Sequence, residues 1–261
     1  MKNRFFILIA ADFAFGMTSL LLAQSGSLLT NANAHQPVLV ELFTSEGCSS
    51  CPPADQLLQE LDGQRTKSGK LIVGISEHVT YWNRLGWTDP FSSEIYTQRQ
   101  NGYAERFHLG DVYTPQMVIN GREQIVGSIR PALLEAINRK TQDRPVVIKV
   151  ASVKRDGDAL TVAFNVEADR EGGPFDVFLV LTDDKDHSQV LRGENAARTL
   201  EHVSVARSFQ RVASMSASGP RTVKVDLPDI PSHGSKVPQH LILFAQSPEL
   251  GDILGATSQQ L

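Results

Sequence analysis

The chain has only two cysteines, so it is not a small secreted scaffold held together by several disulfides. It has no excess of basic residues, because 25 lysines and arginines stand against 29 aspartates and glutamates, for a net charge of −4. No nucleic-acid partner is therefore expected. Beyond the N-terminal segment, no run approaches the roughly 20 apolar residues of a membrane-spanning helix. The composition, 41% hydrophobic and 21% charged over 261 residues, indicates a globular protein of one or two domains.

The first 34 residues have the pattern of an export signal. Lys2 and Arg4 precede an apolar stretch at 5–22, and Ala-Asn-Ala at 32–34 is a small-x-small cleavage site. We therefore expect a signal peptide at 1–34 and a secreted or periplasmic protein with no membrane contact after cleavage. Asp12 interrupts the apolar stretch, and an uncleaved membrane anchor is the alternative. An exported protein meets an oxidising environment, which permits a disulfide between the two cysteines.

The region from 35 to 144 alternates strands and helices. Apolar, β-branched runs at 37–44 and 71–76 predict buried strands, and helical spacing of apolar residues at 54–61 predicts a helix between them. This order predicts two parallel strands joined by a right-handed crossover. The further predicted elements are a polar helix at 93–106, strands at 116–119 and 123–126 around Asn120-Gly121, and a last helix capped by Gly127-Ser128.

The region from 145 to 261 has the pattern of an all-β unit. Apolar and polar residues alternate in short runs, which Gly and Pro pairs separate. Six or seven short strands without helices predict a β-sandwich domain, with the boundary in the polar segment 141–144. The predicted strands lie at 146–153, 160–166, 175–182, 202–212, 221–227 and 240–246.

Cys48 and Cys51 form a CxxC pair between the first strand and the first turn of the following helix. A zinc site needs four ligands, and there is no second cysteine pair. At a helix start, free backbone N–H groups and the helix dipole favour the thiolate of the first cysteine. Cys48 is therefore the predicted nucleophile, and Cys51 the residue that resolves a mixed disulfide. Pro52 and Pro53 lack N–H groups and Glu46 is acidic, so we expect the pKa of Cys48 to fall only modestly, from about 8.5 to about 7.

The order of these elements, with a CxxC at the helix start and Thr-Pro before a later strand, resembles the thioredoxin superfamily. The strings GCSSCPPAD, HVTYW, GWTDPF and VYTPQMVING resemble, more narrowly, a family of secreted bacterial thioredoxin-like proteins of unknown function. The string RGENAARTLEHVSVAR is similar to that family's second domain, so the likeness covers most of the mature chain. The resemblance implies a thioredoxin-like α/β fold, protein or peptide thiols as partners and no cofactor.

The resemblance also implies a substrate site beside the cysteines. Pro115 is expected to be cis, so that the backbone of Thr114 faces the sulfurs and pairs with an extended substrate. A trans proline at a strand start is the alternative. Trp82, in the aromatic segment after the second strand, is a further predicted substrate contact.

Glu41 lies in an otherwise apolar strand, where an unpaired carboxylate is costly. Burial raises the pKa of such a group, and Glu41 is predicted to relay the proton of Cys51. Thioredoxins keep an acid on the equivalent strand, although one extra residue separates Glu41 from the CxxC. The alternative is that strand alternation turns Glu41 to the surface.

His78 follows the second strand and lies near Trp82 in the sequence. A soft metal such as Cu(I) could use its imidazole with Cys48 and Cys51, but a loop packed by aromatics around a hydrogen-bonded histidine is favoured, and no metal is expected. The remaining histidines are expected to be surface or hydrogen-bonded residues: His187, His202, His233 and His240.

The leading hypothesis is thiol–disulfide exchange by Cys48 and Cys51. The alternatives are a non-catalytic binding module with a structural disulfide, and metal delivery. A second, β-sandwich domain without visible chemistry would recruit a partner or substrate. The enzymatic hypothesis requires the Cys48 sulfur to be reachable by a visiting chain, and it fails if the tryptophan-rich loop buries this sulfur with no groove leading to it.

Overall fold

The computed structural model of the protein describes residues 37–139, 146–168, 173–228, 238 and 240–261. The predicted signal peptide, the boundary segment 141–144 and His233 lie outside these residues. Within the described part of the chain, none of the helices has the length and hydrophobicity needed to span a bilayer.

The first half is a mixed α/β unit whose elements follow the predicted order. β1 pairs in parallel with β2 and antiparallel with β3, and β3 pairs antiparallel with β4. Ser93 caps α3 by accepting a hydrogen bond from the Ile95 N–H, but the residue before α4 is Ile129 and not Ser128, so the predicted Gly127-Ser128 cap is wrong. The elements are β1 (Val38–Thr44), α2 (Pro52–Leu61), β2 (Ile72–His78), η2 (Asn83–Leu85), α3 (Glu94–Arg106), β3 (Gln116–Ile119), β4 (Glu123–Val126) and α4 (Arg130–Asn138).

The strands of the second half extend the same sheet. One sheet of eight strands has the order β11-β10-β7-β8-β2-β1-β3-β4, and β8 joins β2 in parallel through Ser76 and Val205. Three of the described strands, in the order β5-β6-β9, form a separate sheet. The elements are β5 (Val146–Asp156), β6 (Ala159–Ala168), β7 (Phe175–Gln189), β8 (Thr199–Met215), β9 (Gly219–Asp226), β10 (His240–Gln246) and β11 (Ile253–Gln260).

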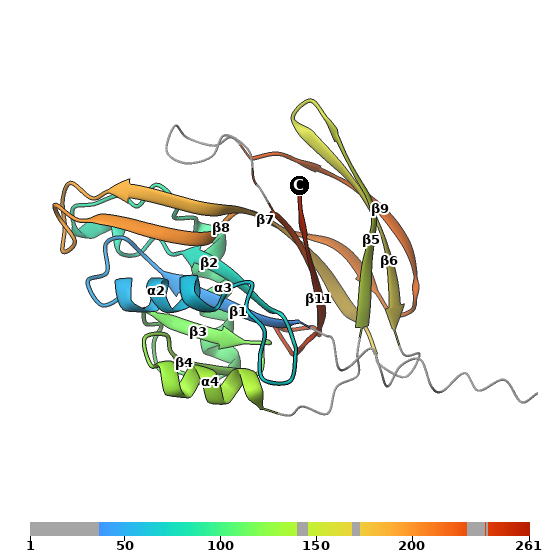
Figure 1. The fold of residues 1–261 in the computed structure, drawn as a ribbon, viewed down its shortest axis with the longest axis horizontal. Coiled ribbons are helices and arrows are strands. Elements are labelled where there is room, and N and C mark those ends of the chain that lie inside the picture. The colour runs from blue at the N-terminus through green and yellow to red at the C-terminus, as the bar shows by residue number, and fades with distance from the viewer. Residues whose placement is uncertain (1–36, 140–145, 169–172, 229–237, 239) are drawn as a thin grey trace, which may run out of the picture.

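The three-stranded sheet packs face to face on the outer part of the large sheet (Figure 1). Buried apolar side chains of β5 and β6 fill this space together with those of β7 and β10. One layer of this β-rich half is therefore continuous with the α/β half. The strand β11 was not predicted, because its sequence ILGATSQQ has little apolar alternation.

The β7–β8 hairpin connects the two halves. Its strands are 15 and 17 residues long, and its tip lies over the loops that follow β1 and β2 (Figure 1). β7 continues past the predicted end at residue 182, because the buried Asp183 and Asp186 interrupt the apolar pattern without ending the strand.

Side chains of β1 alternate between the two faces of the sheet, and only one face packs against α2, the helix that follows the cysteines. One set of side chains packs with α2 and α4: Val38, Val40 and Leu42. The other set packs with tyrosines of α3 on the opposite face: Leu39 and Phe43.

Candidate functional site

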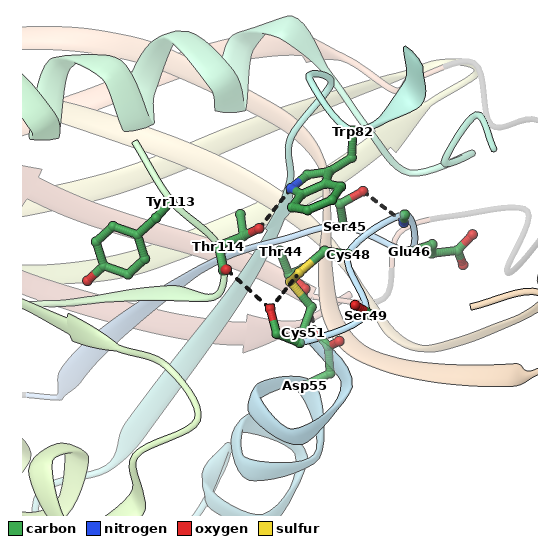
Figure 2. Close-up of a disulfide and its surroundings, with 12 residues drawn as sticks. Thr44, Ser45, Glu46, Cys48, Ser49, Cys51, Asp55, Trp82, Tyr113 and Thr114 are labelled. Atoms are coloured by element: carbon green, nitrogen blue, oxygen red, sulfur yellow. Dashed lines mark hydrogen bonds between the residues drawn. A yellow bond between two sulfur atoms is a disulfide. The ribbon is translucent and has the colours of Figure 1, made fainter. Parts of the chain in front are cut away.

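Cys48 and Cys51 form a disulfide where α2 begins (Figure 2), with an S–S distance of 2.18 Å and a Cα–Cα distance of 5.4 Å. Cys51 is the N-cap residue, and the next two positions are prolines. The Cys51 N–H donates to the Cys48 carbonyl at 3.2 Å, and the Cys51 carbonyl accepts from the Ala54 N–H at 2.8 Å. The pair is therefore held inside a hydrogen-bonded turn that leads into the helix.

The Thr114–Pro115 peptide bond is cis, which confirms that prediction. Ser50 links it to the cysteines, since its hydroxyl oxygen lies 3.4 Å from Cys48 Sγ and donates to the Thr114 carbonyl at 3.5 Å. Trp82 Nε1 donates to Thr114 Oγ1 at 2.8 Å. The structure thus brings Cys48, Thr114 and Trp82 together from three separate segments (Figure 2).

The expectation that the Cys48 sulfur is open to a visiting chain is contradicted. Cys48 and Cys51 are both 0% exposed, whereas Ser49 and Ser50 between them are exposed. Trp82 lies against the preceding loop so closely that a Cβ on Gly47 would be 3.0 Å from Trp82 Cβ. The sequence placed the pair at a helix start, but it did not show what packs over it.

A second cover comes from the tip of the β7–β8 hairpin. Asn195 is 0% exposed, and its amide Nδ2 donates to the carbonyl oxygens of Glu46 at 2.8 Å and Cys48 at 3.0 Å. Glu194 accepts a hydrogen bond from the Ser49 N–H at 3.1 Å. These contacts join residues more than 140 positions apart, so the spacing of motifs in the sequence could not reveal them.

Two residues that flank the cysteines in the sequence, Glu46 and Asp55, have buried carboxylates. Asp55, one turn into α2, accepts from the Thr44 hydroxyl at 2.9 Å, and its N–H donates to the Cys51 carbonyl at 3.2 Å. Glu46, two residues before Cys48, accepts from Trp87 Nε1 at 2.7 Å and from the Ser188 hydroxyl. The sequence analysis gave Asp55 no role, although its four-residue spacing from Cys51 on a helix was a usable signal.

His202 of β8 lies between these carboxylates. Its Nε2 is 3.3 Å from Glu46 Oε1 and its Nδ1 is 3.8 Å from Asp55 Oδ1, but neither nitrogen makes an aligned hydrogen bond. Burial alone lowers the pKa of His202, but Asp55 and Glu46 outweigh it and raise this pKa to about 10. The side chain is therefore an imidazolium at neutral pH. His202 is 1% exposed, so it is a buried charged group and not one of the surface histidines.

His78 makes a different pair on the neighbouring strand. Its Nδ1 lies 2.7 Å from Asp89 Oδ2, and its ring packs edge-on against His202 at 4.6 Å between centroids. Burial tends to raise the pKa of Asp89, but the charge and hydrogen bond of His78 lower it. The described residues include no group of three or more histidine, cysteine or acidic side chains arranged for a metal.

Glu41 is buried, but it lies on the wrong face of the sheet to serve Cys51. Alternation along β1 directs it toward α3, where Arg99 Nε lies 2.5 Å from its Oε1 and the Tyr103 hydroxyl donates to its Oε2 at 2.7 Å. The predicted proton relay through Glu41 is therefore not supported, because α2 packs on the opposite face. Glu77 lies near this pair, and burial followed by repulsion from Glu41 raises the pKa of Glu77 well above its ordinary value.

These features define a mixed α/β protein with a large sheet and a covered disulfide at a helix start. The chain belongs to the family described as "Protein of unknown function (DUF1223)", whose model matches residues 39–246. It is similar to the crystal structure of protein AGR_C_4864 from Agrobacterium tumefaciens, with 29% identity over 86% of this chain and 94% of that one and a TM-score of 0.63. HBP35 of Porphyromonas gingivalis shares the fold, with 16% identity over 87% of this chain and 76% of that one and a TM-score of 0.60. No functionally curated protein matches.

Proposed function

We propose that this protein is an exported thioredoxin-like protein that exchanges disulfides with protein or peptide thiols through Cys48 and Cys51. The observation that carries the proposal is the meeting of the disulfide, the start of α2 and the Thr114 backbone, with Ser50 Oγ in contact with both Cys48 Sγ and the Thr114 carbonyl. A sulfur at a helix start is stabilised as the thiolate by the helix dipole.

The reaction is a two-step exchange with a partner dithiol. A partner thiolate attacks Cys48 Sγ, the Cys48–Cys51 bond breaks, and Cys51 leaves with the electron pair and takes up a proton. The second partner thiol then loses its proton and attacks the partner sulfur of the mixed disulfide, which releases Cys48 as the thiolate. The partner dithiol is thereby oxidised to a disulfide, and the Cys48–Cys51 pair is reduced by two electrons.

Burial of both cysteines means that exchange requires the cover to open. The hydrogen bond between Trp82 and Thr114 closes the side of the site next to the cis-proline. Trp82 also lines a groove of about 440 Å³, together with Tyr81, Asp111 and Val112 among others. A partner segment lying in this groove would displace the indole and reach the Thr114 backbone.

The second candidate is a binding module in which the disulfide is only structural. The complete burial of Cys48 and Cys51 favours this alternative. A disulfide that closes so short a loop restrains the unfolded chain little, which weighs against a purely stabilising role.

A trapping experiment separates the two candidates. In the reverse direction of this exchange, the reduced Cys48 thiolate attacks a partner disulfide and one partner sulfur leaves as a thiol; Cys51 then attacks Cys48 Sγ and releases the other partner sulfur as a thiol. The Cys51→Ser variant lacks this second step, so we expect covalent adducts on Cys48 that a reductant removes. The Cys48→Ser variant is the matched control and should give no such adducts. Equal and negligible adducts in both variants would support the structural disulfide instead.

A further inference from the structure

The surroundings of His202 are mostly charged or polar side chains from several elements. It is the cross-strand partner of Asp186 on β7, and it lies within ion-pair distance of the two carboxylates that flank the cysteines. The neighbouring groups are Asp55 from α2, Glu46 from the loop after β1, His78 with Asp89 beside it, Phe91 before α3, and Asp186 and Ser188 from β7.

The two flanking carboxylates are tied to the cysteine turn by covalent and hydrogen-bonded links. Glu46 is two residues from Cys48, and Asn195 Nδ2 joins their carbonyl oxygens. The Asp55 N–H donates to the Cys51 carbonyl, and Asp55 lies beneath Cys51 in Figure 2. Two buried negative charges at these places disfavour a thiolate on Cys48, because like charges in a low-dielectric site repel.

We propose that His202 is a positioning residue of the cysteine pair, whose positive charge offsets Glu46 and Asp55 and thereby allows Cys48 to ionise. The role is electrostatic, since His202 acts through the two carboxylates and does not need to touch sulfur. It rests on the proposed function, because a stabilised Cys48 thiolate is the attacking or leaving group in exchange with a partner dithiol. The second half of the chain would thus supply, through His202 on β8, the positive charge that balances Glu46 and Asp55 of the first half.

Thiolate absorbance against pH tests the proposal directly. Cys48 alone is measured in the reduced Cys51→Ser protein and in the same protein carrying His202→Gln, Glu46→Gln or both. His202→Gln leaves two unpaired carboxylates, so the pKa of Cys48 should rise by about one unit and the thiolate fraction at neutral pH should fall up to about tenfold. Glu46→Gln should move the pKa of Cys48 in the opposite direction, and the double variant should return toward the parent value.

If His202 had only a structural role, adding Glu46→Gln to His202→Gln would not return the pKa of Cys48 toward its parent value. If both single variants shift the pKa of Cys48 in the same direction, or neither shifts it, the proposal is overturned. Should His202→Gln fail to fold, Glu46→Gln alone still decides, because an unchanged or raised pKa of Cys48 contradicts the electrostatic role. The measurement needs no partner, so its outcome is separate from that of the trapping experiment.

Discussion

Two buried charge groups lie on opposite faces of the sheet, and their chemistry differs. The arginine group, on the α3 face, consists of Glu41, Glu77, Arg99, Tyr103 and Gln246. The histidine group, on the α2 face, consists of Glu46, Asp55 and His202. In the arginine group, the Arg99 guanidinium donates to Glu41, Tyr103 and Gln246, whereas the His202 nitrogens make no aligned hydrogen bond.

This difference in hydrogen bonding suggests that Arg99 has a structural role, whereas the charge of His202 can change with pH. An arginine is charged at every accessible pH, and the aligned hydrogen bonds of Arg99 stabilise one packing of α3 on the sheet. A histidine loses its charge within an accessible pH range, and His202 lies beside the only cysteines in the sequence. We therefore expect changes in the arginine group to alter stability, and changes in the histidine group to alter the cysteines as well.

The largest effect on stability is expected from Arg99→Met. It leaves Glu41 and Glu77 buried without a cation, which costs about 3–5 kcal/mol. Urea unfolding at neutral pH measures the loss, and Arg84→Met, at an exposed arginine of η2, is the control. A loss no larger than that of the control would show that the arginine group is not structural.

A change in pH should separate His202 from Arg99. The pKa of His202 is raised from 6.5 in the unfolded chain to about 10 in the fold. Its contribution to stability is therefore fully present below about pH 6.5 and disappears as the pH rises through about 10. Compared with His202→Gln, the parent should be more stable by on the order of 3 kcal/mol at pH 6, with the difference shrinking toward pH 10.

The control for this pH series is His187→Gln, since His187 is exposed on β7. Its stability should stay within a few tenths of a kcal/mol of the parent at each pH. A difference between the parent and His202→Gln that does not change over this range would mean that His202 is not charged in the fold.

Within the arginine group, Glu77→Gln and Glu41→Gln should differ. Burial and repulsion from Glu41 raise the pKa of Glu77 above its ordinary value of 4.5, so this carboxyl destabilises the fold increasingly as the pH rises above 4.5. Glu77→Gln should therefore be neutral or stabilising by about 1 kcal/mol at pH 7, whereas Glu41→Gln removes the partner of Arg99 and should cost about 2–3 kcal/mol. Thermal unfolding of both variants measures the contrast, and equal losses would contradict it.

A smaller loss of stability than those of Arg99→Met and Glu41→Gln is expected from Asn195→Ala at the hairpin tip. The substitution removes two hydrogen bonds to the loop before the disulfide and should cost about 1–2 kcal/mol. Because the tip then holds the loop less firmly, reduction of the disulfide by a small dithiol should become several-fold faster. Asn165→Ala, at an exposed asparagine of β6, should change neither quantity. An unchanged reduction rate in Asn195→Ala would show that the tip does not limit access.

Local patterns in the sequence predicted the α/β half well. The bounds of β3 and β4 and the parallel pairing of β1 and β2 are as expected, because turn residues and strand periodicity specify them within a few positions. The cis Pro115 is also as expected, but that prediction came from the family resemblance and not from a local pattern. Contacts between distant segments were not predicted. The pairing of β8 with β2, the burial of His202 and the Asn195 contact all depend on how the hairpin returns to the first half.

Strand alternation also explains why the prediction for Glu41 was not supported. A shift of one position along a strand moves a side chain to the other face, and the sequence did not show which face α2 would cover. Asp55, which follows Cys51 by one helical turn, is the carboxylate that lies on the cysteine side.

The reduction potential of the Cys48–Cys51 disulfide tests the central claim most directly. The folded protein is equilibrated with dithiol and disulfide mixtures of known ratio, and the oxidised fraction is measured by alkylation after denaturation. A redox pair is expected to have a potential between about −270 and −120 mV, the range of known exchange proteins. A potential below about −300 mV, together with no reduction of the native protein by partner dithiols, would identify a structural disulfide and contradict the account.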